Sequence, residues 1–128
     1  MQTDKFLKTR PFSLRARVNS FRFAWNGIHR FFAQEHNAWI HAAATITVII
    51  SACWFRVSRQ EMVLLIVVTG LVWVAEIFNT AIEKMMDFIA PGYHPRVKII
   101  KDLAAAGVLV ASVIALATGA FIFIPKIF

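Results

Sequence analysis

Four polar residues near the end of a long apolar stretch carry the clearest chemical signal in the sequence. In a helix, at about 100° per residue, four side chains point within about 80° of one another: Glu76, Asn79, Glu83 and Asp87. Carboxylates are costly in hydrocarbon and mark functional sites by default. Like charges this close repel unless a cation neutralises them. Because Mg²⁺ prefers carboxylate and phosphate oxygens, the pattern predicts a site for a divalent cation and phosphate.

A simpler interpretation is that this polar face only solvates a helix as it leaves the membrane. Taken alone, Asp87 is better explained in that way, because it lies nearest the end of the segment. Glu76 follows an apolar run directly and lies one to two turns deeper. Solvation therefore explains Glu76 poorly, and Glu76 is the strongest single candidate for function.

The composition indicates where such a face must lie. The chain has 128 residues, of which 59% are hydrophobic and 16% charged, and its mean hydropathy is +0.63. Soluble domains are about half apolar and about a quarter charged. A chain this short has too little interior to bury the excess, so the excess must face lipid. We expect an all-α integral membrane protein.

Three stretches reach the length of about 20 residues that crosses a bilayer. The predicted membrane helices are 38–55, 62–89 and 103–124, and the third stops at Pro125. Before them, residues 12–33 form an amphipathic pattern, with Phe21, Trp25 and Phe32 on one face and arginines on the other. Such a helix lies in the membrane interface. We expect a single membrane domain over residues 1–128.

Basic residues orient the chain, because Lys and Arg gather on the cytoplasmic side. Eleven of them precede the first span or surround the second turn, against three on the opposite side: Arg56, Arg59 and Lys126. This places the N-terminus in the cytoplasm and the C-terminus outside. The net charge of +7 does not indicate nucleic-acid binding, because the basic residues flank apolar stretches and form no continuous stripe.

Two further polar patches fall at the same predicted membrane level. Glu35 lies at the entry of the first span, with Asn37 and His41 close behind, and Lys101-Asp102 lies at the entry of the third. Carboxylates at the cytoplasmic ends of all three spans, with a lysine among them, favour a cation–phosphate site. Lys101 alone is equally well explained as a residue that snorkels to the membrane surface.

Familiar catalytic motifs are missing from the sequence. The five glycines form no phosphate-binding loop or dinucleotide fingerprint, and neither soluble kinase signature occurs. Cys53 stands alone, which excludes an intrachain disulfide.

The run from Glu76 to Glu83, followed by Asp87, resembles the signature of the small bacterial diacylglycerol kinase/undecaprenol kinase family. The likeness covers residues 20–126 and includes Trp25, Gly27, Glu35, Asn37, His41, Tyr93-His94-Pro95 and Lys101-Asp102. Within the family, the sequence is more similar to the undecaprenol kinase branch.

The resemblance implies a homotrimeric helical bundle in the bacterial cytoplasmic membrane. Each active site lies between subunits and transfers the γ-phosphate of ATP, with Mg²⁺, to a lipid alcohol, either undecaprenol or diacylglycerol. By motif position, Glu76 is the general base, Glu35 and Glu83 bind Mg²⁺, and His94 lies near the nucleotide. The polar set is completed by Asn79, Lys101 and Asp102, and we place Asp87 with the cofactor-binding residues.

Two interpretations of other classes stay open at this point. The polar face could join helices in a non-catalytic membrane assembly protein, or Glu76 and Glu83 could line a small oligomeric ion channel. Lipid-dependent ATP consumption separates the kinase from both.

Overall fold

The computed structural model describes residues 12–128, and within them the secondary structure is entirely helical. The described chain divides after Gln34 into two compact units. The first contains α1, and the second contains α2, α3 and α4 and is called the three-helix unit (residues 35–128). The predicted all-α class is confirmed, as are three helices long and apolar enough to cross a membrane.

Helix α1 spans Leu14–Gln34, close to the predicted range 12–33. Its predicted apolar face is largely exposed, including Phe21, Trp25 and Ile28. The guanidinium of Arg22 lies 5.7 Å from the centroid of the Phe23 ring. Exposed aromatic residues beside arginines are what an interfacial helix offers to a membrane surface.

Glu35 is the first residue of the three-helix unit and directly precedes α2. Its backbone is extended, and its side chain does not cap α2, which spans His36–Trp54. The helix ends in a turn in which the N–H of Val57 donates to the carbonyl of Ala52, and that of Arg56 to the carbonyl of Cys53. This is a Schellman arrangement, which usually has glycine at the left-handed position. Here that residue is Arg56, with φ of 49°.

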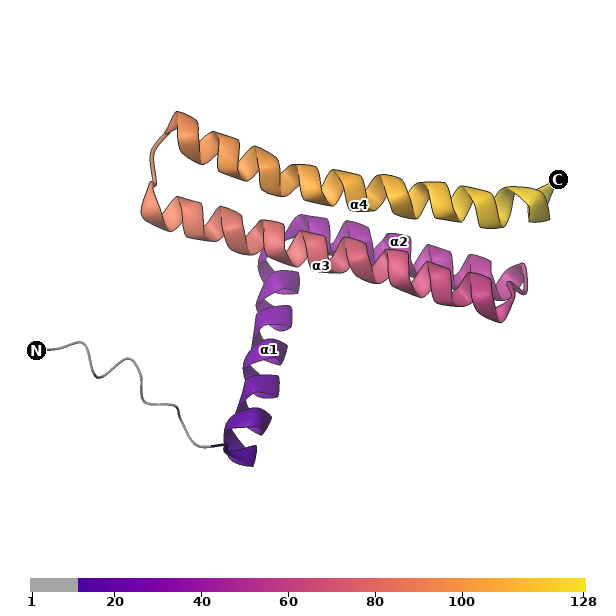
Figure 1. Cartoon of the computed structure of the whole chain (residues 1–128), viewed down its shortest axis with the longest axis horizontal. Coiled ribbons are helices and arrows are strands. Elements are labelled where there is room, and N and C mark those ends of the chain that lie inside the picture. Colours follow the sequence, from indigo (N-terminus) through magenta and orange to yellow (C-terminus); the bar gives the residue numbers. More distant parts are fainter. Residues whose placement is uncertain (1–11) are drawn as a thin grey trace, which may run out of the picture. The chain divides into compact units, whose positions relative to one another are not determined.

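Helix α3 spans Arg59–Ile89 and begins at a capping box. The Ser58 side chain accepts from the N–H of Glu61, and the Glu61 carboxylate accepts from the N–H of Ser58 at 2.6 Å. These two bonds satisfy donors that a helix start leaves unpaired. The connection from α2 is short, so α2 and α3 are antiparallel neighbours, as predicted (Figure 1).

Helix α4 spans Pro95–Ile127 and extends beyond the predicted range 103–124 at both ends. It starts earlier because His94 caps it through Nδ1, which accepts from the N–H of Arg96, and Pro95 takes the first helical position, where it needs no donor. It does not stop at Pro125. The last turn continues to Ile127, and the N–H of Phe128 donates to the carbonyl of Ile124.

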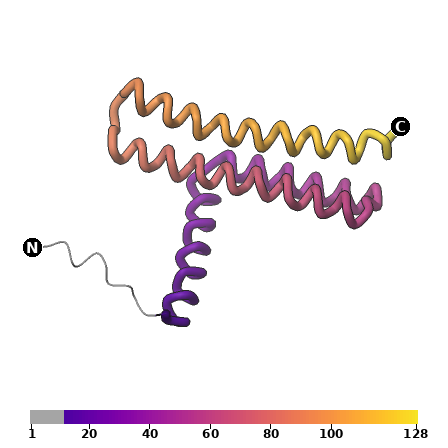
Figure 2. The backbone as a smooth tube through the Cα atoms, viewed as in Figure 1, coloured from indigo at the N-terminus to yellow at the C-terminus, as the bar shows by residue number. Residues whose placement is uncertain are grey.

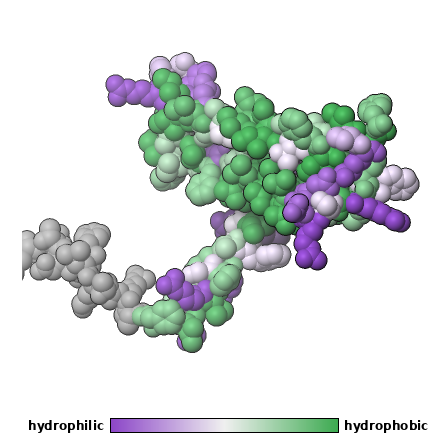
Figure 3. Space-filling view, turned by 45° about the vertical axis from the view of Figure 1, so that its right-hand side comes forward, coloured by the Kyte–Doolittle hydropathy of each residue, from purple (hydrophilic) through white to green (hydrophobic). Residues whose placement is uncertain are grey.

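The three-helix unit is a hairpin of α3 and α4 with α2 alongside α3. Its two turns lie at opposite ends, as the tube trace shows (Figure 2). The buried apolar cluster is Ala52, Leu65 and Ile122, near the α2–α3 turn. Hydrophobic side chains dominate the middle of the surface and hydrophilic ones gather toward its ends (Figure 3). This pattern matches a bundle whose middle faces lipid.

Candidate active site

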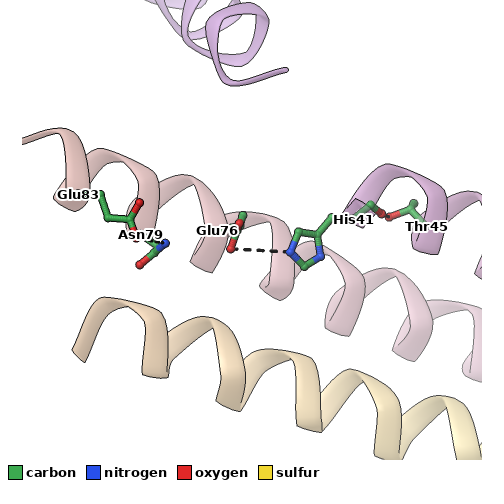
Figure 4. Close-up of polar contacts among 5 residues, drawn as sticks. All are labelled: His41, Thr45, Glu76, Asn79 and Glu83. Atoms are coloured by element: carbon green, nitrogen blue, oxygen red, sulfur yellow. Dashed lines mark hydrogen bonds and ion pairs between the residues drawn. The ribbon is translucent and has the colours of Figure 1, made fainter. Parts of the chain in front are cut away.

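One face of α3 changes its chemistry along the helix. Seven residues are buried at helical spacing: Leu65, Val68, Val72, Glu76, Asn79, Thr80 and Met86. The half toward the α2–α3 turn is apolar, and Glu76, Asn79 and Thr80 follow it. Glu76 keeps only 2% of its surface exposed. The predicted alignment of Glu76, Asn79 and Glu83 on one face is therefore present, and Figure 4 shows their order along α3.

Glu76 faces a histidine from the neighbouring helix. Nε2 of His41, on α2, lies 3.8 Å from Oε2 of Glu76, and both side chains are largely buried, at 20% and 3% exposure. In Figure 4 the imidazole points from α2 toward the carboxylate. The sequence placed His41 near the site but gave it no role, so this pairing is new information from the structure.

His41 is itself held by two neighbours. The ring of Trp73, one turn before Glu76, meets the imidazole edge to face, with centroids 6.1 Å apart. The indole N–H of Trp73 donates to Oγ1 of Thr45 at 3.0 Å, and that hydroxyl donates to the carbonyl of His41 at 2.7 Å. Sequence reasoning missed Trp73 and Thr45, and their polar atoms inside apolar spans were the available signal.

Asn79 and Glu83 form the next part of the site. Nδ2 of Asn79 donates to Oε1 of Glu83 at 3.2 Å. Oδ1 of Asn79 is buried and has no hydrogen-bond partner among residues 12–128. A buried polar atom without a partner costs about 1–3 kcal/mol, so each such atom in a native structure calls for an explanation. A ligand that donates a hydrogen bond to this oxygen, or a cation that binds it, would be one.

Four other predicted site residues are engaged in ion pairs. Oε1 of Glu35 lies 2.9 Å from Nζ of Lys84, which follows Glu83 in the sequence. The ion pair of Glu35 is therefore with Lys84, and Glu35 is not paired with Glu83. Lys101 on α4 pairs with Asp87 on α3, which ties the two helices near their connection. Asp102 pairs with Lys98 on its own helix.

The structure thus brings some predicted residues together and leaves others apart. Glu76, Asn79 and Glu83 form a row, and Asp87 and Lys101 form a pair beyond it. His94 is exposed and serves as the α4 cap. Within the described residues, no group of three or more His, Cys, Asp or Glu side chains has the arrangement of a metal site.

A groove runs from this site along the three-helix unit. It has a volume of about 550 Å³ and is lined by all three helices. His41 and Trp73 line it near Glu76, Phe123 lies toward the α2–α3 turn, and small residues such as Ala44 and Ala115 lie between them. The lining is overwhelmingly apolar, so the groove suits hydrocarbon.

Comparison with known proteins identifies the relatives of this chain. The profile of the prokaryotic diacylglycerol kinase family matches residues 22–123. An undecaprenol kinase of Bacillus subtilis strain 168 is 37% identical over 84% of this chain and 88% of its own length. A diacylglycerol kinase of Escherichia coli K12 is 33% identical over 79% of this chain and 83% of its own length.

A diacylglycerol kinase of a Synechocystis strain is 34% identical over 84% of the chain, which spans 62% of that relative's length. The three apolar helices and these relatives define a class, that of multi-pass bacterial membrane kinases for lipid alcohols. The chain belongs to the prokaryotic diacylglycerol kinase family. The resemblance read from the Glu76–Glu83 motif is therefore confirmed. The kinase interpretation also prevails over the channel and assembly alternatives.

Proposed function

We propose that this protein transfers the γ-phosphate of ATP, with Mg²⁺, to the hydroxyl group of undecaprenol or diacylglycerol, and that Glu76 is the general base. The observation that carries the proposal is the burial of Glu76, at 2% exposure, inside a membrane helix. A carboxylate in such a place is costly unless it has a function. A lipid hydroxyl near headgroup level would reach it from within the membrane.

The donor atoms around Glu83 fit Mg²⁺. The ion takes hard oxygen ligands and usually binds through one or two carboxylates and substrate phosphates. The unpartnered Oδ1 of Asn79 and the adjacent Glu83 carboxylate are oxygens of this kind. Glu35 could serve as the second proposed carboxylate ligand only after its 2.9 Å pair with Lys84 opens.

Phosphoryl transfer asks the protein mainly for position and charge neutralisation. In the proposed reaction, Glu76 takes the hydroxyl proton, the lipid oxygen bonds to the γ-phosphorus, and the bond to ADP breaks. The phosphoryl group comes from ATP, and Mg²⁺ held by Glu83 and Glu35 would offset the negative charge of the phosphates. Lys101 adds positive charge on the polar side of the site, with Asp87, His94 and Asp102 as the proposed nucleotide-side residues.

The apolar groove supports a lipid substrate. It ends at His41 and Trp73, beside the Glu76 carboxylate, so a hydrocarbon chain within it would direct its terminal hydroxyl toward the base. The hydroxyl-bearing end of a single prenyl chain suits such a path, in keeping with the 37% identity with the undecaprenol kinase of Bacillus subtilis.

The assembly and orientation belong to the same proposal. Three spans are too few to shelter a row of polar groups on every side, and exposed charge in lipid is costly. We therefore propose a homotrimer with sites between subunits. The N-terminus would face the cytoplasm, because eleven of the fourteen Lys and Arg residues lie on that side.

Purified protein in mixed micelles tests the proposal directly. Radiolabelled Mg-ATP would be supplied with undecaprenol, diacylglycerol or a long-chain alkane of similar size. We expect labelled lipid from one or both alcohols and none from the alkane. ATP hydrolysis that does not depend on an added alcohol, without labelled lipid, would refute the lipid kinase proposal.

A further inference from the structure

The distance between the side chains of Glu76 and His41 suits a single oxygen atom that both of them bind. Oε2 of Glu76 and Nε2 of His41 are 3.8 Å apart, which is too far for a direct hydrogen bond. An oxygen placed beside the line that joins these two atoms can lie about 2.8 Å from each, at ordinary hydrogen-bond length. The two groups therefore form an acceptor and a donor that share one small site.

The surrounding helices supply no competing ionisable group at this level. Helix α4 has no Asp, Glu, Lys, Arg or His between Asp102 and Lys126. On α2, the ionisable residues besides His41 are His36, in the first turn, and Cys53, near the opposite end. On α3, Glu83 lies two turns farther along the same face. His41 is thus the group that α2 contributes to Glu76.

The imidazole also packs against a side chain that is itself held in place. Trp73 packs against its edge, and the Trp73–Thr45–His41 chain of hydrogen bonds joins the indole to the backbone that bears the ring. These hydrogen bonds fix Trp73, and the packed indole in turn limits the orientations open to the imidazole, so that the ring can hold a ligand in one geometry. The cluster lies at the end of the apolar groove, where the polar end of a lipid would arrive.

We propose that His41 is a substrate-binding residue that holds the hydroxyl of the lipid alcohol between itself and Glu76. An alcohol has one hydrogen to donate and two lone pairs to accept. The hydroxyl donates to Oε2 of Glu76, and one lone pair accepts from the Nε2–H of His41, which leaves the other lone pair directed at phosphorus. This assignment rests on the proposed function and adds a recognition element for the hydroxyl itself.

Substitutions at His41 test the assignment, because they should change kcat/KM for the lipid and leave the KM for Mg-ATP nearly unchanged. His41→Leu removes the donor and should lower kcat/KM for the lipid alcohol about tenfold to a hundredfold, the scale of one hydrogen bond to a charged pair. The KM for Mg-ATP should stay within about twofold. His41→Gln retains an N–H donor and should recover to within about fivefold of the original protein. His36→Leu, in the exposed first turn of α2, is the matched control and should leave both parameters unchanged.

Two comparisons separate binding from folding and from the parent proposal. If His41→Leu unfolds in detergent, Thr45→Val, which removes the support for Trp73, should lower kcat/KM for the lipid alcohol by a smaller factor. Equal losses in the Leu and Gln variants, or an equal rise in the Mg-ATP KM, would overturn the role of His41. Absence of lipid phosphorylation in the unsubstituted protein would instead refute the proposed function.

Discussion

Two of the glutamates on α3 have opposite surroundings: Glu61 in the first turn and Glu76 just past the middle of the helix. Glu61 is fully partnered: its carboxylate accepts from the N–H of Ser58 and contacts Nζ of Lys126 at 3.0 Å, with 27% of its side chain exposed. Glu76 is buried and faces His41 across 3.8 Å, and one turn farther along α3 the Oδ1 of Asn79 has no hydrogen-bond partner within residues 12–128.

This contrast indicates that one part of α3 stabilises the fold and another part carries the chemistry. The Glu61 end joins all three helices, because the apolar cluster of Ala52, Leu65 and Ile122 lies beside the cap and the ion pair. Apart from Arg56, which is left-handed, the local preferences described there agree with the fold. At the Glu76 end the buried residues include polar ones, of which Asn79 is incompletely paired within the described part of the chain, and such local violations are expected at functional sites.

The strongest test of this contrast exchanges each glutamate for glutamine. Glu76→Gln keeps the size of the side chain but removes the proton acceptor, so we expect kcat to fall at least about a hundredfold. Nucleotide binding and thermal stability should be nearly unchanged. Steady-state lipid phosphorylation and thermal unfolding in detergent measure the two effects.

Glu61→Gln is the matched control on the same helix. It weakens the capping box and the contact with Lys126, and should cost about 1 kcal/mol of stability while kcat stays within about twofold. If Glu76→Gln kept full turnover, or if Glu61→Gln abolished it in a folded protein, the division of the helix into a catalytic and a structural end would be wrong.

Mixed assemblies sharpen the proposal that sites are shared between subunits. Co-reconstituted Glu76→Gln and Lys101→Ala chains should regain a measurable fraction of activity, because some sites would then receive both intact residues from different chains. Glu76→Gln mixed with His41→Leu should not exceed the two parents, because Glu76 and His41 face each other within one chain. Recovery in the second mixture, or none in the first, would contradict this allocation.

The metal proposal is tested by the Mg²⁺ dependence of the rate. Glu83→Ala should raise the half-saturating Mg²⁺ concentration about tenfold, the lower scale for losing support of a metal site. Glu35→Ala should do the same, and the double variant should be little worse, since residues that act as a unit give non-additive losses. Lys84→Met removes the ion-pair partner of Glu35 and should lower the half-saturating Mg²⁺ concentration. Multiplying effects would show that the two carboxylates do not share an ion.

The smallest expected effect is at the structural end. Arg56 occupies a left-handed conformation, with φ of 49°, that glycine adopts without steric cost. Arg56→Gly should therefore raise stability by up to about 1 kcal/mol, with lipid phosphorylation unchanged. Thermal unfolding in detergent measures the gain, and a loss of stability would mean that the arginine side chain contributes more than its backbone costs.

Much of the fold was predictable because lipid imposes simple rules. Apolar length identified all three spans, since each must satisfy its backbone internally. The bounds of α4 were less accessible: apolar content starts the segment at 103, whereas the helix starts at Pro95, where the His94 cap decides. Local capping, not hydropathy, sets that boundary.

The site was predictable only as far as one helix determines it. The 3.6-residue period aligns Glu76, Asn79 and Glu83 whatever their surroundings. The contact of His41 with Glu76 depends on the register of α2 against α3, and the Lys84 partner of Glu35 depends on the same register. That register follows from the tight turn at Arg56 and from packing between helices, which no periodicity within a segment reveals.

The unequal lengths of the helices have a consequence for the membrane itself. At 19 residues, α2 is about 28 Å long, whereas α3 and α4, at 31 and 33 residues, are about 46 and 50 Å. A hydrocarbon layer of about 30 Å matches α2 but not the hairpin, which must tilt or project beyond it. Bilayer thickness then becomes an effector: thinner or thicker lipids would shift Glu76 relative to the depth of the substrate hydroxyl and change the rate without any change in sequence.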